Sequence, residues 1–428
     1  MTALAYHRLQ KGWDLRPLKH IAALNPEVLP EDTDPDWTFP YVDIGNVTFE
    51  AGITGTELVR FADAPSRARR RVRNGDTIVS TVRTYLRAIA PVSNQPDGLI
   101  ASTGFAVVRA KPPTNAGYLS WALRSSTFVE AVVADSVGVS YPAIAPSVLG
   151  ALPVPVPPPA EQHAIADFLD RETAKIDALI ATQERLIALL DEKRQATITH
   201  AVTKGLDPTA PMKESGVEWL GEVPANWGVL PLKRCCRIPN GLVDSTVGRN
   251  AALPLIAPNH IQSGTGRLLE LETADDQGAI SGKYHFVEGT VLYSKIRPAL
   301  RKACVAPFEG LCSADMYPIY STKITSRLLL YQILGDCFSS FAILASDRVA
   351  MPKVNRETIG DFPMVVPPSA EQEVIVRYVD EAVAEIDRLR DRSVEVIERL
   401  RERRTALITA AVTGQVDVSH PAITEAAK

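Results

Sequence analysis

The chain carries an internal duplication, and this feature constrains its fold more than any other. Residues 160–170 read AEQHAIADFLD and residues 370–380 read AEQEVIVRYVD. A gap-free comparison of 160–203 with 370–413 finds 19 identical residues in 44 positions. A spacing of 210 residues is far too long for a solenoid repeat. We therefore expect two copies of one structural unit in a pseudo-twofold arrangement.

Weaker matches upstream show that each whole half is duplicated. Trp13 and Pro17 match Trp227 and Pro231, while Gly75, Ser80, Arg83, Leu86 and Arg87 match Gly289, Ser294, Arg297, Leu300 and Arg301. Each half thus holds a variable globular part followed by a constant part. The predicted division is a first globular domain at 1–158, a spacer helix at 159–208, a second globular domain at 209–367, a spacer helix at 368–416 and a tail at 417–428.

The two constant parts have the pattern of long helices. Each follows a proline-rich run, and neither contains glycine or proline before Gly205 or Gly414. Forty-four helical residues span about 66 Å. Such a helix could pack on its own domain, but a domain of about 150 residues is too small to cover it. An antiparallel coiled coil is favoured, with a and d positions at Leu169, Ile176, Ile180, Ile187, Leu190, Val379, Val383, Ile386, Ile397, Leu400 and Leu407.

The globular parts read as mixed α/β units. Residues 72–83 and 286–297 each place a glycine turn before a β-branched run, which predicts entry into a strand. Helical stretches are expected near 116–134 and 326–344. The predicted fold class is α+β, with two mixed α/β domains joined by two long antiparallel coiled-coil helices.

Composition supports packed cores but gives no simple indication of a polyanion partner. Hydrophobic residues make up 46% of the 428 residues, and the formal net charge is −4. The charge is +1 in each globular part and −3 in each of the two remaining segments. Any polyanion is therefore expected to meet local basic faces on the globular parts. We find no apolar run long enough for a membrane span and no signal peptide, which predicts a cytoplasmic protein with no membrane partner.

Local basic faces are visible within this near-neutral background. Arginines cluster between 67 and 73, and two arginine positions of the first half recur in the second. Arginine and lysine contacts to phosphate supply affinity for nucleic acid. The repeated arginines could equally form ion pairs that stabilise the fold. The candidate DNA-binding residues from this pattern are Arg69, Arg70, Arg71, Arg83, Arg87, Lys295, Arg297 and Arg301.

The sequence lacks the motifs of a catalytic or metal-binding protein. It has no glycine-rich cofactor loop, no complete Walker loop and no histidine pair with ligand spacing. The five cysteines include no C-x-x-C pair, so we expect reduced and mostly buried thiols. No catalytic, cofactor-binding or metal-binding residue is predicted.

The order of motifs resembles the specificity (S) subunit of type I restriction-modification enzymes, the HsdS family. The resemblance covers nearly the whole chain, and its most specific segments are 158–177, the stretch SGVEWLG at 215–221 with Pro224 and Trp227, and 368–372. It implies two target recognition domains that each read one half of a bipartite DNA target, while the helices set the gap. The separate estimate of helix length, about 66 Å, equals nearly two turns of B-DNA.

The resemblance also implies partner subunits. Two methyltransferase (M) subunits would dock on the helices, and restriction/translocase (R) subunits would join them. S-adenosylmethionine, ATP and Mg would then be used by those partners, and none would bind this chain directly. The implied docking and spacer residues are Glu161, Gln162, Asp170, Asp177, Glu371, Gln372, Asp380 and Asp387. In the family, the segment before the P-x-P exit of each domain often approaches DNA, which adds Ser140, Tyr141, Arg348, Lys353 and Asn355 as candidates.

Two other functional hypotheses remain open at this point. The acidic helices and net charge also suit a coiled-coil scaffold whose domains bind proteins, and such a scaffold would show no salt-dependent binding to DNA. A self-sufficient DNA-modifying enzyme is suggested only by Asp191-Glu192-Lys193, which resembles the end of a nuclease motif. It would require cleavage or methyl transfer by the chain alone.

Overall fold

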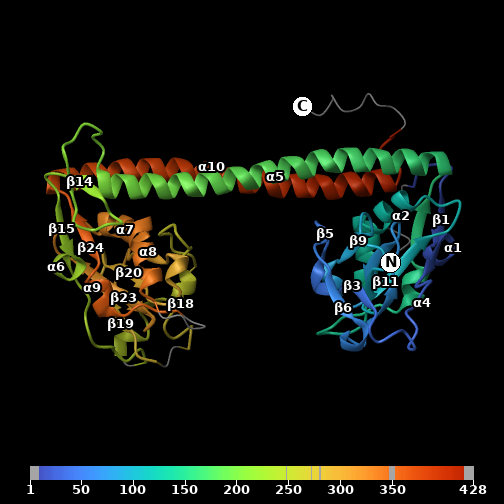
Figure 1. The fold of residues 1–428 in the computed structure, drawn as a ribbon, viewed down its shortest axis with the longest axis horizontal. Helices are drawn as coiled ribbons and strands as arrows, with labels where there is room; N and C mark the ends of the chain where they lie inside the picture. The colour runs from blue at the N-terminus through green and yellow to red at the C-terminus, as the bar shows by residue number, and fades with distance from the viewer. Residues whose placement is uncertain (1–8, 247, 271, 279–280, 347–351, 419–428) are drawn as a thin grey trace. The chain divides into compact units, whose positions relative to one another are not determined.

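The computed structural model describes residues 9–418 apart from 247, 271, 279–280 and 347–351. By residue contacts the chain forms two compact units (Figure 1). The first unit comprises Met1–Gln183 with Glu395–Lys428, and the second comprises Glu184–Val394. Each unit therefore contains one globular part and a segment of each long helix. Because this grouping follows contacts and not the order of the chain, it does not test the five predicted segments, whose boundaries stay a prediction.

The first globular part consists of two four-stranded sheets, two two-stranded ribbons and short helices. The sheet orders are β6-β3-β10-β7 and β2-β11-β8-β9, and the ribbons pair β1 with β12 and β4 with β5. The elements are β1 (Asp14–Pro17), α1 (Leu18–Ile21), β2 (Ala22–Leu24), β3 (Thr38–Val42), β4 (Val47–Thr48), β5 (Gly52–Ile53), β6 (Glu57–Arg60), β7 (Ala68–Arg71), β8 (Thr77–Ser80), β9 (Ile89–Pro91), β10 (Ile100–Ser102), β11 (Phe105–Ala110), α2 (Ala116–Leu123), α3 (Ser126–Ala134), α4 (Pro146–Ala151) and β12 (Pro153–Val156).

The second globular part repeats the order of both four-stranded sheets, and an isolated bridge between Ile261 and Leu268 replaces the β4–β5 ribbon. Its sheets run β18-β17-β22-β19 and β16-β23-β20-β21, and β15 pairs with β24 as β1 pairs with β12. The elements are β15 (Gly228–Pro231), α6 (Leu232–Cys235), β16 (Cys236–Arg237), β17 (Pro254–Ile256), β18 (Glu272–Thr273), β19 (Tyr284–Phe286), β20 (Val291–Ser294), β21 (Ala303–Val305), β22 (Gly310–Cys312), β23 (Met316–Ser321), α7 (Ser326–Leu334), α8 (Asp336–Leu344), α9 (Arg356–Gly360) and β24 (Pro363–Val366). The duplication inferred from sequence is therefore a duplication of topology.

Strand entry follows the glycine turns as predicted. Gly75 and Gly289 have positive φ angles of 96° and 81°, a conformation that glycine adopts without a steric penalty. The strands that follow, β8 and β20, are buried at every position. Both therefore form the centre of their sheets rather than an edge.

The predicted helical stretches are each broken into two helices. In the first part, Ser125 has extended backbone angles, and its hydroxyl accepts a hydrogen bond from the Phe128 N–H, so it ends one helix and caps the next. In the second part, Gly335 takes the same role with an extended backbone. The predicted helical stretches are confirmed, and a serine or a glycine, which permits a sharp change of direction, divides each of them.

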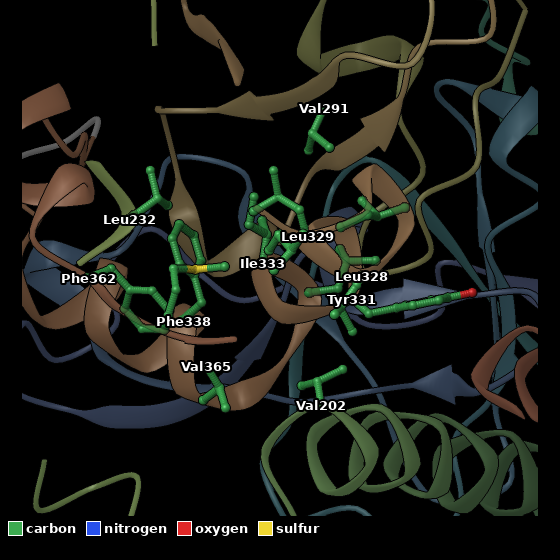
Figure 2. Packing of buried hydrophobic residues seen from close by; sticks show 14 of the residues in the cluster. Val202, Leu232, Val291, Leu328, Leu329, Tyr331, Ile333, Phe338, Phe362 and Val365 are labelled. Atoms are coloured by element: carbon green, nitrogen blue, oxygen red, sulfur yellow. The ribbon is translucent and has the colours of Figure 1, made fainter. Parts of the chain in front are cut away.

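Each globular part packs a hydrophobic core against its segments of the long helices. In the second unit, the cluster around α7 and α8 includes Phe338, Phe362 and Leu232 (Figure 2). Val202 of the long helix and Val365 of β24 belong to the same cluster. Burial of this continuous apolar surface is the main stabilising contribution to the attachment of the globular part to the helix.

The long helices are α5 (Pro159–Lys204) and α10 (Ser369–Val412). Within the second unit, Arg390 bonds to Asp191 and Arg194 bonds to Asp387, both at 3.2 Å. The residue number rises by three on one helix as it falls by three on the other, so the helices are antiparallel. Every predicted a or d residue is buried or half-buried, as the predicted seam requires, and Leu169, Val379 and Val383 are buried in the cores of the globular parts. The predicted fold class is likewise confirmed for the α/β topology and the helix pairing.

The segment that follows α5 forms a hairpin that has no counterpart among the described residues of the first half. It consists of β13 (Met212–Glu214) and β14 (Glu222–Pro224) and contains the SGVEWLG stretch. The Trp219 ring stacks on Phe362 with centroids 5.4 Å apart. The Lys204 ammonium at the end of α5 donates to the carbonyl of Leu220 at 3.2 Å. This stretch therefore closes the end of α5 onto the second globular part.

Among the described residues, no single helix is long and apolar enough to cross a bilayer. Only α7 and α8 together reach that length and apolarity, as a pair bent by 59°. All five cysteines are free, and four of them are buried.

Candidate nucleic-acid interface

The repeated arginines bracket a strained turn in both halves. Each turn is a short 3₁₀ helix, η4 (Thr84–Leu86) in the first half and η7 (Pro298–Leu300) in the second. Arg83 and Arg87 have φ angles of 50° and 52°, and Arg297 and Arg301 have 48° and 47°. A left-handed conformation costs a residue with a side chain roughly 1–2 kcal/mol. Of six non-glycine residues with positive φ among those described, four are these arginines.

Buried hydrogen bonds hold the turns in this conformation. The Ser80 hydroxyl donates to the carbonyl of Val82 at 2.6 Å, and the Ser294 hydroxyl donates to that of Ile296 at 3.0 Å. Both serines are almost fully buried. Backbone strain that recurs in two diverged copies, and that buried groups maintain, is a feature of functional sites. We call these two segments, 83–87 and 297–301, the arginine turns.

A second loop pairs with each arginine turn. In the first half Val82 forms a β-bridge with Ala143, and in the second Ile296 forms one with Lys353. The first bridge carries the predicted Ser140 and Tyr141 to the turn, where the Arg83 guanidinium lies 4.9 Å from the centroid of the Tyr141 ring. Both residues are exposed, and Tyr141 is 66% accessible. The structure thus brings together candidates that lie more than fifty residues apart.

The second half gathers its candidates less completely. The Arg297 N–H donates to the carbonyl of Pro352 at 2.7 Å, which places exposed Lys353 beside the turn. The Asn355 side chain caps α9 by accepting from the Thr358 N–H at 2.8 Å. Arg301 forms an ion pair with Asp336 at 2.9 Å. Arg348 lies outside the described residues.

Sequence reasoning missed two residues of the second half, Tyr317 and Arg356, which lie beside the predicted Lys295. The Lys295 ammonium and the Arg356 guanidinium lie 5.4 and 5.3 Å from the centroid of the Tyr317 ring. Arg356 also donates to the Tyr284 hydroxyl at 3.2 Å. Burial raises the pKa of Tyr317, so the ring stays neutral between the two cations. Tyr317 has no tyrosine counterpart in the first half, so repetition could not reveal it. The signal that could have revealed Arg356 was its position directly after the candidate Asn355.

The cluster Arg69, Arg70 and Arg71 lies on β7, in the sheet that does not carry the arginine turn. Arg69 stacks over Phe61, with the guanidinium 5.0 Å from the ring centroid. Arg70 is half-buried, and this burial lowers its pKa. Only Arg71 is exposed. Their role in DNA binding stays a prediction.

The predicted docking and spacer residues all contact other parts of the chain. The contacts recur in both halves: Trp13 and Trp227 donate to Glu161 and Glu371; Asn115 and Thr325 donate backbone N–H groups to Gln162 and Gln372; Trp121 and Tyr331 donate to Asp170 and Asp380; and Arg404 and Arg194 pair with Asp177 and Asp387. These side chains therefore attach each globular part to the helices or hold the helices together. Docking of a partner on them stays a prediction.

Within the described part of the chain, no cluster of three or more histidine, cysteine, aspartate or glutamate residues could hold a metal ion. What the arginine turns offer is exposed positive charge beside an aromatic ring or a lysine. Such groups can contact phosphates and the edges of bases.

Comparison with known proteins identifies relatives of the chain. Residues 12–188 match the family model described as the type I restriction modification DNA specificity domain. The EcoDI type I restriction enzyme specificity subunit of Escherichia coli is 32% identical over 287 residues, which cover 64% of either chain. The StySPI subunit of Salmonella potsdam is 24% identical over 64% of this chain and 59% of its own. The chain thus spans less than two thirds of these relatives' length.

Solved structures share the fold along almost the whole chain. One, reported for complex assembly and conformational transition of the type I R-M system, has a TM-score of 0.69 at 23% identity and covers 96% of this chain and 100% of its own. The HsdS subunit from Thermoanaerobacter tengcongensis has a TM-score of 0.52 at 22% identity, with 96% and 99% covered. The chain is therefore similar in sequence to type I restriction enzyme specificity subunits over 64% of its length, and it shares the fold of the solved structures along almost all of it.

Proposed function

We propose that the chain is the sequence-specific DNA-recognition subunit of a type I restriction-modification complex. Each globular part reads one half of a bipartite double-stranded DNA target through its arginine turn and the loop paired with it. The chain itself is not catalytic. It acts in the cytoplasm with two methyltransferase subunits and with restriction/translocase subunits, which use S-adenosylmethionine, ATP and Mg.

The observation that carries this proposal is the recurrence of the strained arginine turn. The globular parts have diverged over most of their sequence, yet both retain two arginines in left-handed conformation at equivalent positions. An ion pair does not account for the position of Arg83, which among the described residues pairs with no carboxylate and instead stacks on exposed Tyr141. Two such turns on two similar domains suit a target that has two separate halves.

The helices act in this proposal as the element that sets the gap between the half-sites. Helix α5 has 46 residues and α10 has 44, so each is about 66–69 Å long. Two turns of B-DNA measure about 68–72 Å. Exposed apolar residues on the helices, including Leu189, Val374, Tyr378 and Leu389, offer a surface for the methyltransferase subunits.

The test is a map of methylated bases in genomic DNA from cells that express the methyltransferase partner with or without this chain. We expect a split motif with a fixed gap and a modified adenine in each half, which disappears when the chain is absent. An unchanged map, with both proteins expressed, would refute the proposal and favour a scaffold that binds proteins.

A further inference from the structure

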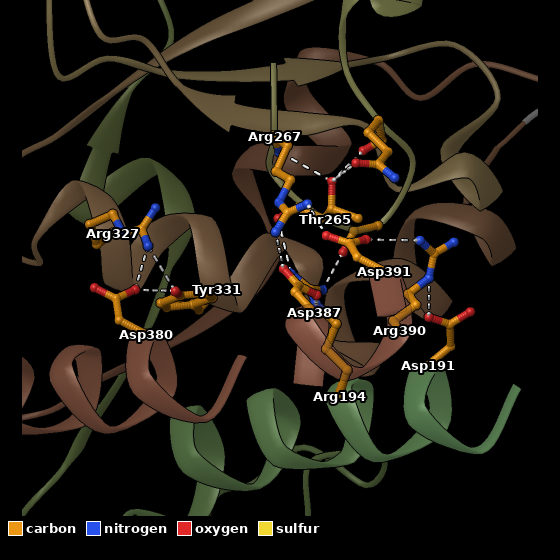
Figure 3. A network of polar contacts seen from close by, with 12 residues as sticks. Asp191, Arg194, Thr265, Arg267, Arg327, Tyr331, Asp380, Asp387, Arg390 and Asp391 are labelled. Atoms are coloured by element: carbon orange, nitrogen blue, oxygen red, sulfur yellow. Dashed lines mark hydrogen bonds and ion pairs between the residues drawn. The ribbon is translucent and has the colours of Figure 1, made fainter. Parts of the chain in front are cut away.

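A loop of the second unit, residues 262–267, is clamped to both long helices (Figure 3). Arg194 of α5, whose side chain is 6% exposed, donates to the carbonyls of Gly264 at 2.5 Å and Thr265 at 3.0 Å. The same guanidinium bonds to Asp387 of α10 at 3.2 Å. Arg267, within the loop, pairs with Asp387 and Asp391 of α10 at 3.2 and 3.4 Å. The loop is thus fixed through both backbone and side chain.

The clamped loop contacts the arginine turn of its own unit. The Gly264 N–H donates to the carbonyl of Arg301 at 3.1 Å, at the residue that ends the turn in left-handed conformation. A second connection runs through side chains. Arg301 pairs with Asp336 at 2.9 Å, and the Asp336 N–H donates to the Thr199 hydroxyl of α5 at 3.0 Å. Two short chains of contacts therefore join α5 to the arginine turn.

The first unit has the equivalent helix contacts but lacks the connection to its turn. Arg404, the counterpart of Arg194, directs two nitrogens to Asp177 at 2.8 and 3.3 Å. Within the described part of this unit, residues 47–56, which correspond to the clamped loop, form no hydrogen bond or ion pair with α5 or α10. The counterpart of Asp336 is Ser126, whose hydroxyl contacts Thr409 and carries no charge to pair with Arg87. The clamp is a property of the second unit.

We infer that Arg194 is a positioning residue for DNA recognition by the second globular part. It holds the loop that supports the Arg301 carbonyl, and so fixes the second arginine turn relative to the α5 segment of the same unit. A guanidinium is suited to this, because its planar group of donors reaches two carbonyls and a carboxylate at once. This inference rests on the proposed function and adds to it an asymmetry between the two half-sites.

The experiment uses the chain assembled with its methyltransferase subunits and duplexes that carry the target read from the methylation map. Discrimination is measured as the ratio of Kd for a duplex with one mismatch to Kd for the cognate duplex, separately for each half-site. Arg297→Met, in the second arginine turn, identifies the half-site that the second unit reads. Arg404→Met is the matched control, since it removes the equivalent ion pair between the helices but no loop contact.

We expect Arg194→Met to lower discrimination about tenfold in the half-site identified by Arg297→Met and to leave the other half-site unchanged, since a base contact contributes about that factor. Arg404→Met should leave both ratios unchanged. Arg194→Lys should restore part of the loss, because an ammonium reaches fewer of the three acceptors. Thermal stability should fall similarly in the two methionine variants, which separates positioning from simple stabilisation.

Equal discrimination in wild type and Arg194→Met, or equal losses in both half-sites, would overturn the inference while leaving the proposed function intact. If Arg194→Met does not fold, Arg267→Met replaces it, because that side chain is 49% exposed. An unchanged ratio in Arg267→Met would then overturn the inference. If wild type itself shows no discrimination, the proposed function fails, and the inference fails with it.

Discussion

One buried amide, that of Gln372, joins the second globular part to α10 through three hydrogen bonds. Its oxygen accepts from the Thr325 N–H at 2.9 Å, and its nitrogen donates to the carbonyls of Pro367 at 2.9 Å and Lys323 at 3.1 Å. Thr325 is the N-cap of α7, so this amide satisfies a backbone donor that the helix itself leaves unpaired. We predict that Gln372→Met strongly destabilises the second unit alone.

The expected magnitude follows from the groups left without partners. Methionine nearly preserves the side-chain volume, so the loss is mainly one of hydrogen bonds rather than a cavity. Lys323 and Thr325 are both exposed, so their backbone groups can bond to water, whereas Pro367 is buried and its carbonyl has no such replacement. One unpaired buried group costs about 1–3 kcal/mol. We therefore expect a loss of about 1–3 kcal/mol.

The assay is native-state hydrogen exchange, which reports the opening free energy of each unit separately. Amides of α7 should lose protection in Gln372→Met, while those of α2 in the first unit keep theirs. Glu373→Ala, at the exposed neighbouring position, is the control and should change stability by less than about 0.5 kcal/mol. Unchanged protection of α7, or an equal loss in both units, would refute the reasoning.

Three further predictions concern charge and burial. In DNA binding by the assembled complex, Arg83→Met should lower the slope of the logarithm of the binding constant against log salt concentration by about one. Arg60→Met is the control and should leave the slope unchanged, because Arg60 is paired with Asp36 and Asp63. Burial raises the pKa of the Cys236 and Cys304 thiols to about 12. Iodoacetamide at about pH 8 should therefore label these two cysteines only in the urea-unfolded chain, as measured by mass spectrometry, and labelling of the native chain would contradict this. Hydrogen bonds from Arg109 and Arg73 lower the pKa of Glu27 below its ordinary 4.5. The ionised Glu27 therefore stabilises the fold above that pH, and this contribution is lost as the pH falls through the lower pKa of the folded state. The free energy of unfolding, measured against pH in acid, should depend less on pH in Glu27→Gln than in wild type, and identical curves would count against the pairing.

The fold could be predicted from sequence because duplication supplies an internal comparison. The a and d positions, the glycine turns before β8 and β20, and the repeated α/β topology all follow from patterns present twice. The break between α2 and α3 was missed because Ser125 and Gly335 differ in residue type while sharing one extended conformation. A local change of direction of this kind leaves little trace in periodicity.

The candidate site was predictable where the two halves agree and where the family resemblance supplied a segment. Arg83 and Arg297 were found through their repetition, but the bridges that bring Tyr141 and Lys353 to them are long-range pairings invisible in the sequence. The Tyr317 and Arg356 cluster has no counterpart and so no internal signal. For residues such as Gln162, repetition indicated importance without indicating whether the partner lies within the chain or outside it. A contact within the chain and a contact with another subunit would both require the same polar residue on the same helix.

The central claim is that two arginine turns read two half-sites, and selection from a random duplex library by the assembled complex tests it most directly. Wild type should enrich two short sequence blocks separated by a fixed gap. The double variant Arg83→Met with Arg87→Met should lose one block, and Arg297→Met with Arg301→Met should lose the other. Enrichment of no motif, or loss of the same block in both double variants, would contradict the account.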